Sequence, residues 1–169
     1  MFQYGAFLPV FRSHGSDTPR EVWRFGKPGE PFYDSLIKVI HLRYRLLPYI
    51  YSLAGKVHRE NYTMTRTLAF DFAKDMQVAD LKDEFMFGPA LLVAPVTNPM
   101  YYSVDSNPLG NVDKTRRVYL PDGADWIDFW TGKKYKGGQW IVAEATINEI
   151  PLLVRQGSII PMGSVMQYT

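Results

Sequence analysis

The 169-residue sequence contains no cysteine. Disulfide bonds, thiol catalysis and cysteine-ligated metal sites are therefore excluded, and the absence is in keeping with a bacterial protein of the cytoplasm or the periplasm. Long hydrophobic runs are absent too. No stretch approaches the roughly 18 apolar residues of a membrane span, so the sequence predicts no membrane partner. The opening residues, MFQYGAF, lack a basic segment and a cleavage site, and they predict a strand rather than a signal peptide.

Charge of one sign is not in large excess either. The 19 basic and 17 acidic residues give a formal net charge of +2, and no dense basic cluster occurs, so no nucleic-acid partner is predicted. The short basic groups at Arg43 and Arg45 and at 133–136 are expected to lie on solvated faces.

The three histidines of the sequence show no metal-binding spacing such as H-E-x-x-H. Neither a metal nor a cofactor is therefore predicted. We expect His41 and His58, which fall within a helical pattern, to be structural or exposed.

Aromatic residues are abundant: 11 Tyr, 10 Phe and 4 Trp make up 15% of the chain. Such rings fill hydrophobic cores, and they also stack on the apolar faces of sugars. Composition alone leaves both interpretations open.

The first part of the chain alternates strand and helix patterns. We predict a strand over 3–12, a loop over 13–33, a long helix over 34–60, a short strand over 65–72 and a helix over 74–86. Pro48 lies inside the long helix and predicts a kink there. This order is typical of a β/α unit, whose two strands should be parallel.

The second part predicts short strands separated by turn signals. The strands are expected at 90–96, 116–120, 125–130, 139–143, 149–155 and 158–160, with a flexible hairpin loop over 98–115. This spacing favours an antiparallel sandwich. The predicted fold class is therefore α+β, with a strand-helix-strand-helix segment over 1–88 and a β-sandwich domain over 89–169.

The stretch FLPVFRSHG places a cation, a hydroxyl and an imidazole after an apolar run. A strand that runs out into solvent would explain this pattern, with His14 as an ordinary loop histidine. An active-site rim would explain it as well, because a rigid strand end can direct polar groups towards a ligand. The residues alone leave both explanations open.

Six segments, in order along the chain, resemble glycoside hydrolase family 31, the retaining α-glucosidases and α-xylosidases. They are QYGAFLPVFRSHG with TPREVW, HLRYRLLPYIYSLA, TRTLAFDF, FMFGPALLVAPV, RRVYLPDGADWIDFWTGKKYKGGQWI and IPLLVRQGSIIPM. The resemblance implies that residues 1–88 end a catalytic (β/α)8 barrel and that residues 89–169 form the β-sandwich that follows it.

The resemblance also implies substrate-binding roles for two residues. His14 would hydrogen-bond sugar hydroxyls and Arg12 would support neighbouring carboxylates, at the face where barrel strands end. The two catalytic aspartates of the family lie on earlier barrel strands, so we expect no catalytic residue in this chain and no activity from the chain alone. The form RSHGSDTPREVW favours an α-xylosidase over an α-glucosidase, acting on the terminal sugar of an oligosaccharide.

Two other interpretations remain at this point. The chain could be a non-catalytic carbohydrate-binding module that stacks sugars on Trp126, Trp130, Tyr135 and Trp140, or a structural sandwich. The unpaired edges of the strands at 3–12 and 65–72 also predict an oligomer when the chain is isolated, or disorder in the first 30 residues.

Overall fold

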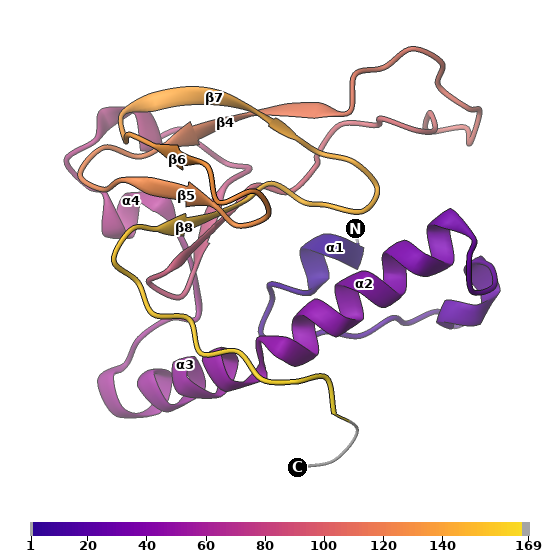
Figure 1. Ribbon diagram of the computed structural model, residues 1–169, viewed down its shortest axis with the longest axis horizontal. Helices are drawn as coiled ribbons and strands as arrows, with labels where there is room; N and C mark the ends of the chain where they lie inside the picture. The colour runs from indigo at the N-terminus through magenta and orange to yellow at the C-terminus, as the bar shows by residue number, and fades with distance from the viewer. Residues whose placement is uncertain (1, 167–169) are drawn as a thin grey trace.

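The structure, a computed structural model, describes residues 2–166, and its strands form two antiparallel sheets (Figure 1). The larger sheet has the strand order β1-β2-β3-β8-β5-β6. Its strands are β1 Thr65–Thr67, β2 Phe85–Phe87, β3 Leu91–Val93, β8 Leu152–Arg155, β5 Trp126–Asp128 and β6 Lys134–Tyr135. The smaller sheet pairs β4 (Thr115–Leu120) with β7 (Gln139–Glu144).

Helices precede most of the strands along the chain. They are α1 Phe2–Gly5, the 3-10 turn η1 Val22–Phe25, α2 Pro31–Arg45, α3 Leu47–Glu60, α4 Leu68–Asp71 and the 3-10 turn η2 Met76–Val78. Among the described residues, no helix has the length and apolarity needed to cross a membrane.

The long helix predicted over 34–60 is present as two helices, with a break at Leu46. Pro48 lies in the first turn of α3, where a missing N–H removes no intrahelical hydrogen bond. A helical hydrogen bond persists at this break, because Leu46 N–H donates to the Leu42 carbonyl at 3.0 Å. Proline therefore divides the predicted helix and redirects its second half.

The larger sheet lies between the helices and the smaller sheet. Side chains of a strand alternate between its two faces: Leu91 and Val93 pack in one buried cluster with residues of α2 and α3, and Leu92 packs in another with residues of β4 and β7. All three side chains are buried. The result is a layer of helices, the larger sheet and then the smaller sheet, as Figure 1 shows.

Tyr49 connects α3 to the turn between β2 and β3. Its hydroxyl donates to the Phe87 carbonyl at 2.9 Å and accepts from Ala90 N–H at 3.2 Å, and burial raises its pKa above the usual value for a tyrosine. Gly88 in the turn has φ +61°, and a Cβ there would lie 2.3 Å from the Tyr49 hydroxyl oxygen. Only glycine suits this close approach.

Several predictions for the first part of the chain are wrong. Residues 3–12 form α1 and an irregular run instead of a strand, so the parallel pair predicted with the strand at 65–72 is absent among the described residues. The helix predicted over 74–86 is present only as the short turn η2, and its last residues belong to β2, which pairs antiparallel with β1. A strand needs a hydrogen-bonded neighbour, and among residues 2–166 no segment pairs with residues 3–12. Phe7 is buried there by packing on Phe87, with the ring centroids 6.0 Å apart.

The prediction of an antiparallel sandwich is confirmed. The strands expected at 90–96, 116–120, 125–130, 139–143 and 149–155 appear as β3, β4, β5, β7 and β8, whereas residues 158–160 form no strand. The predicted loop over 98–115 contains a single antiparallel bridge, between Tyr102 and Pro108. The domain boundary between residues 88 and 89 stays a prediction, and β1 and β2 of the larger sheet precede it.

Candidate functional site

A cleft of about 520 Å³ lies where the irregular run after α1 passes α2 and η1. Both residues predicted to bind substrate line it, together with apolar and aromatic side chains. The lining residues that matter here are Arg12, Ser13, His14, Phe2, Phe11 and Phe25. An aromatic cleft with a few polar groups suits a ligand that has apolar faces and hydroxyl edges.

Arg12 and His14 are in direct contact at this cleft. Nη2 of Arg12 lies 2.8 Å from Nδ1 of His14, and both side chains are exposed. A guanidinium can only donate, so Nδ1 must accept and the imidazole proton lies on Nε2. His14 therefore presents an N–H donor to a ligand. Arg12 forms no ion pair with any described carboxylate, and its predicted role beside carboxylates stays a prediction.

The loop after His14 is closed by short contacts. The Ser13 hydroxyl donates to the Arg20 carbonyl at 2.7 Å. A Cβ at Gly15 would lie only 2.1 Å from the carbonyl oxygen of Thr18, so the backbone approach excludes any larger residue. The loop thus depends on glycine at position 15.

Gly15→Ala is expected to open this loop at little cost in stability, about 1 kcal/mol or less, because the segment is exposed. Backbone amide signals of residues 13–20 should move in NMR spectra. Gly110→Ala is the matched control, because its Cβ would meet no atom within 4 Å. Unchanged signals over 13–20 in Gly15→Ala would contradict the described loop.

Arg43 supports the segment that leads to the cleft, although the sequence predicted a solvated face for it. The side chain is buried, and it donates to the carbonyls of Ala6, Leu8 and Pro9 at 2.8, 2.7 and 3.1 Å. Burial lowers the pKa of its guanidinium. Helical spacing could have revealed this residue, because positions 39, 43, 46 and 50 lie on one helix face and the other three are apolar.

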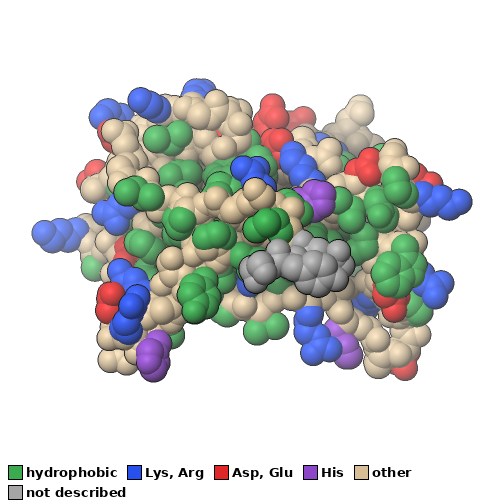
Figure 2. Space-filling view, turned by 60° about the horizontal axis from the view of Figure 1, so that its bottom comes forward, with side chains coloured by type: hydrophobic (Ala, Val, Ile, Leu, Met, Phe, Trp, Pro, Cys, Tyr) green, Lys and Arg blue, Asp and Glu red, His purple; other side chains and the backbone are tan. Residues whose placement is uncertain are grey.

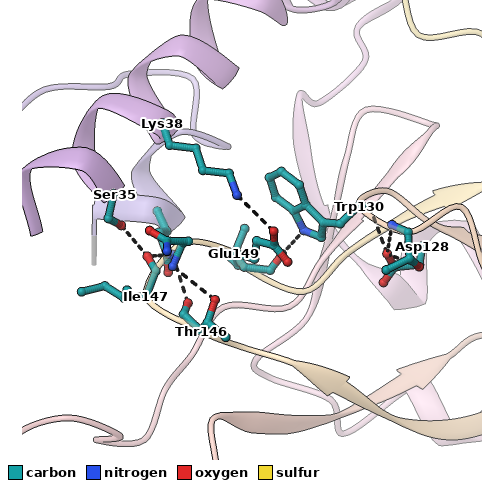
Figure 3. A network of polar contacts seen from close by, with 11 residues as sticks. Ser35, Lys38, Asp128, Trp130, Thr146, Ile147 and Glu149 are labelled. Carbon is teal, nitrogen blue, oxygen red and sulfur yellow. Dashed lines mark hydrogen bonds and ion pairs between the residues drawn. The ribbon is translucent and has the colours of Figure 1, made fainter. Parts of the chain in front are cut away.

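A polar network joins α2 to the sandwich (Figure 3). Nζ of Lys38 lies 3.0 Å from Oε1 of Glu149 and 4.9 Å from the ring centre of Trp130. Trp130 Nε1–H donates to the Ile150 carbonyl at 2.8 Å, and the Ser35 hydroxyl donates to the Ile147 carbonyl. The helix that carries Arg43 is thereby fixed to the sandwich.

The remaining histidines lie away from the cleft lining. His41 and His58 are exposed, as predicted. Among residues 2–166, no cluster of three His, Asp or Glu side chains is placed to hold a metal ion.

The aromatic residues of the sandwich do not form one stacking surface. Trp126 is fully buried, and Trp130 is partly buried with its N–H already engaged. Trp140 is 42% exposed, but the Arg117 guanidinium carbon lies 4.7 Å from its ring centre. Of these three tryptophans, Trp140 is the most exposed.

A larger hollow of about 870 Å³ lies beside β1 and the segment before β2. Its carboxylates are Asp83 and Glu84. Nη2 of Arg116 lies 2.9 Å from Oδ2 of Asp83 and 3.7 Å from Oε1 of Glu84. Oε1 of Glu84 also accepts from the Tyr119 N–H at 2.9 Å. These contacts join β4 to the segment that precedes β2, and we favour the smaller cleft, where Arg12 and His14 meet, as the ligand site.

Two family models match this chain. One, described as the glycosyl hydrolase family 31 C-terminal domain, matches residues 61–160. The other, the glycosyl hydrolases family 31 TIM-barrel domain, matches residues 1–53. The cleft residues Arg12 and His14 fall in the barrel match, and the sandwich falls in the C-terminal match.

Similar proteins include glycosidases of much greater length. The chain is 42% identical over 161 residues to an α-xylosidase of Saccharolobus solfataricus, covering 95% of this chain and 20% of that protein. It is 36% identical to α-glucosidase 2 of Bacillus thermoamyloliquefaciens, covering 99% and 19%. The chain thus spans about a fifth of the length of these curated relatives.

Solved structures show the same likeness. A family 31 α-xylosidase from Xanthomonas citri superposes with a TM-score of 0.86 at 46% identity, covering 99% of this chain and 17% of that one. A family 31 dextranase from Flavobacterium johnsoniae, complexed with glucose, gives a TM-score of 0.83 at 36% identity, with 99% and 19% covered.

Proposed function

This chain belongs to glycoside hydrolase family 31, and on that premise we propose that it serves a retaining, exo-acting α-glycosidase as the end of its barrel and the following sandwich. The contact between Arg12 and His14 carries the proposal, because it fixes the imidazole with an N–H donor at the cleft. A terminal sugar of an oligosaccharide would accept that hydrogen bond through a hydroxyl and rest its apolar face on the aromatic lining.

The chemistry needs groups that this cleft lacks. Retaining glycosidases use two carboxyl groups about 5–5.5 Å apart: one attacks the anomeric carbon, and the other protonates the leaving oxygen and later activates water. No carboxylate lines the cleft within residues 2–166. We propose that both catalytic aspartates belong to barrel strands outside this chain, so that the chain alone is inactive.

We propose xylose rather than glucose as the terminal sugar. The RSHGSDTPREVW segment supports this preference, as does the identity of 42% to an α-xylosidase against 36% to an α-glucosidase. The two sugars differ in the C6 hydroxymethyl group, which only glucose carries.

Hydrolysis of p-nitrophenyl α-D-xylopyranoside and α-D-glucopyranoside tests the proposal. The 169-residue chain should release no p-nitrophenol, and a longer protein that contains it should cleave the xyloside faster. His14→Ala in the longer protein should lower kcat/KM by about 10- to 100-fold, the effect of losing a hydrogen bond to the reacting sugar. The exposed His41→Ala is the control and should leave kcat/KM unchanged. Turnover by the 169 residues themselves would refute the proposal.

We also propose that the isolated chain self-associates. Large apolar side chains reach the surface in many places, including Trp23, Phe25 and Phe32, and Figure 2 shows apolar groups over much of one face. The end strands β1 and β6 leave edges of the larger sheet open to pairing. Light scattering should detect a dimer or a larger species. A strictly monomeric chain at about 100 µM would count against self-association.

A further inference from the structure

The segment between α1 and the cleft has little regular structure of its own. Among the described residues, its backbone–backbone hydrogen bonds are two turn contacts. Phe7 N–H donates to the Tyr4 carbonyl at 3.0 Å, and Leu8 N–H donates to the Gly5 carbonyl at 3.1 Å. Ala6 and Phe7 are nevertheless buried, and a few residues later the side chains of Arg12 and His14 are exposed. Something other than a helix or a sheet must fix where this segment leaves the core.

One guanidinium meets the carbonyls of this segment. Nη1 of Arg43 donates to Ala6 and Leu8, and Nη2 donates to Pro9. Buried carbonyls need such donors, and the planar fork of arginine can bind several at once, whereas a lysine offers a single nitrogen. The guanidinium carbon also lies 6.0 Å from the ring centre of Phe11, next to Arg12.

The support beneath Arg43 is rigid. It lies in the last turn of α2, between Leu42 and Leu46 of the buried cluster, and α2 is fixed to the sandwich through Ser35 and Lys38. A path of direct contacts therefore runs from the sandwich, through α2 and Arg43, to the segment that ends at His14.

We propose that Arg43 is a positioning residue for the sugar-binding site: by holding three carbonyls of residues 6–9, it sets where Arg12 and His14 stand at the cleft. This inference rests on the proposed function for its role in catalysis, but the positioning itself is a property of the chain. Arg43 does not itself line the cleft, and it acts on Arg12 and His14 through the segment it holds, contacting the lining residues Leu8 at the carbonyl and Phe11 at the ring.

Distance measurements between spin labels test the positioning. The chain lacks cysteine, so His14→Cys and Tyr51→Cys introduce the only two labelling sites, and Tyr51 on α3 is exposed. Double electron–electron resonance should give a narrow distance distribution in this background. Adding Arg43→Met should widen it by about twofold, as expected for a segment released from its hydrogen bonds.

Two further variants complete the test. Arg43→Lys keeps the charge and one donor nitrogen, which favours folding, and it should widen the distribution as well. Arg45→Met is the matched control, because Arg45 is exposed on the same helix, and it should leave the distribution unchanged. Near-ultraviolet circular dichroism identifies the folded variants. An unchanged distribution in a folded Arg43→Lys or Arg43→Met protein would overturn the inference.

Kinetics in the longer protein separate this inference from the proposed function. Arg43→Lys should lower kcat/KM for the xyloside about tenfold while Arg45→Met leaves it unchanged. A longer protein without any glycosidase activity would refute the proposed function, and the spin-label distances would still decide whether Arg43 positions the segment.

Discussion

Replacing Trp126 by alanine is expected to lower the free energy of unfolding by about 3–5 kcal/mol, the usual cost of removing a large buried ring. Trp126 is fully buried in the cluster between the two sheets, and its ring centre lies 5.7 Å from that of Phe72. Its indole N–H donates to the Pro121 carbonyl at 3.1 Å, which alanine would leave without that donor. Urea unfolding followed by circular dichroism measures the loss.

Trp140→Ala is the control for this experiment. The residue is of the same type but partly exposed, and it packs on Tyr119 with ring centres 5.2 Å apart. Its loss should cost only about 1 kcal/mol. Similar losses from the two variants would mean that the cluster around Trp126 is not the core of the sandwich.

Glu84→Gln is expected to change the free energy of unfolding more favourably at pH 8 than at pH 5, by about 2–3 kcal/mol. Burial raises the pKa of Glu84 from 4.5 to about 7, and the negative charge of Asp83 acts in the same direction. The Tyr119 N–H and the Arg116 guanidinium favour the ionised form, but Arg116 stands 3.7 Å away and is shared with Asp83. Desolvation of the buried carboxylate outweighs both.

The sign of the effect follows from proton binding. Between pH 4.5 and about 7, the folded protein holds a proton on Glu84 that the unfolded chain releases. The stabilisation from Glu84 is therefore complete below pH 4.5 and is lost as the pH rises through about 7. Glutamine remains neutral and avoids this loss.

Urea unfolding of both proteins at pH 5 and pH 8 measures the difference. The exposed Glu144→Gln, at the end of β7, is the matched control and should show the pH dependence of the unsubstituted chain. Parallel pH dependences for Glu84→Gln and the unsubstituted chain would contradict a buried carboxyl that titrates near neutral pH.

The strands of the sandwich were predictable because their signals are local. Each of them is a short apolar or alternating run flanked by turn residues. Gly132 and Gly138, for example, take positive φ values in turns next to strands. The two-residue strand β6 was missed because its pattern is too short to recognise. The antiparallel pairing of β1 with β2 was missed because residues 85–86 of β2 were predicted to end a helix, and because pairing depends on contacts distant in sequence.

The candidate site could be predicted only in part. The ordered motifs pointed to Arg12 and His14, and the structure brings these two side chains together at a cleft. The strand expected beneath them is absent, because strand formation requires neighbours that residues 3–12 lack among the described part of the chain. The support from Arg43 went unrecognised because a lone arginine on an apolar helix face is usually assigned to solvent.

An NMR titration of the 15N-labelled chain with xylose tests most directly whether the sugar binds at His14. We predict chemical-shift changes at Arg12, His14 and their neighbours, lost in His14→Ala and retained in His41→Ala. Shifts that centre on Trp140 and survive His14→Ala would contradict the account and favour a carbohydrate-binding module instead.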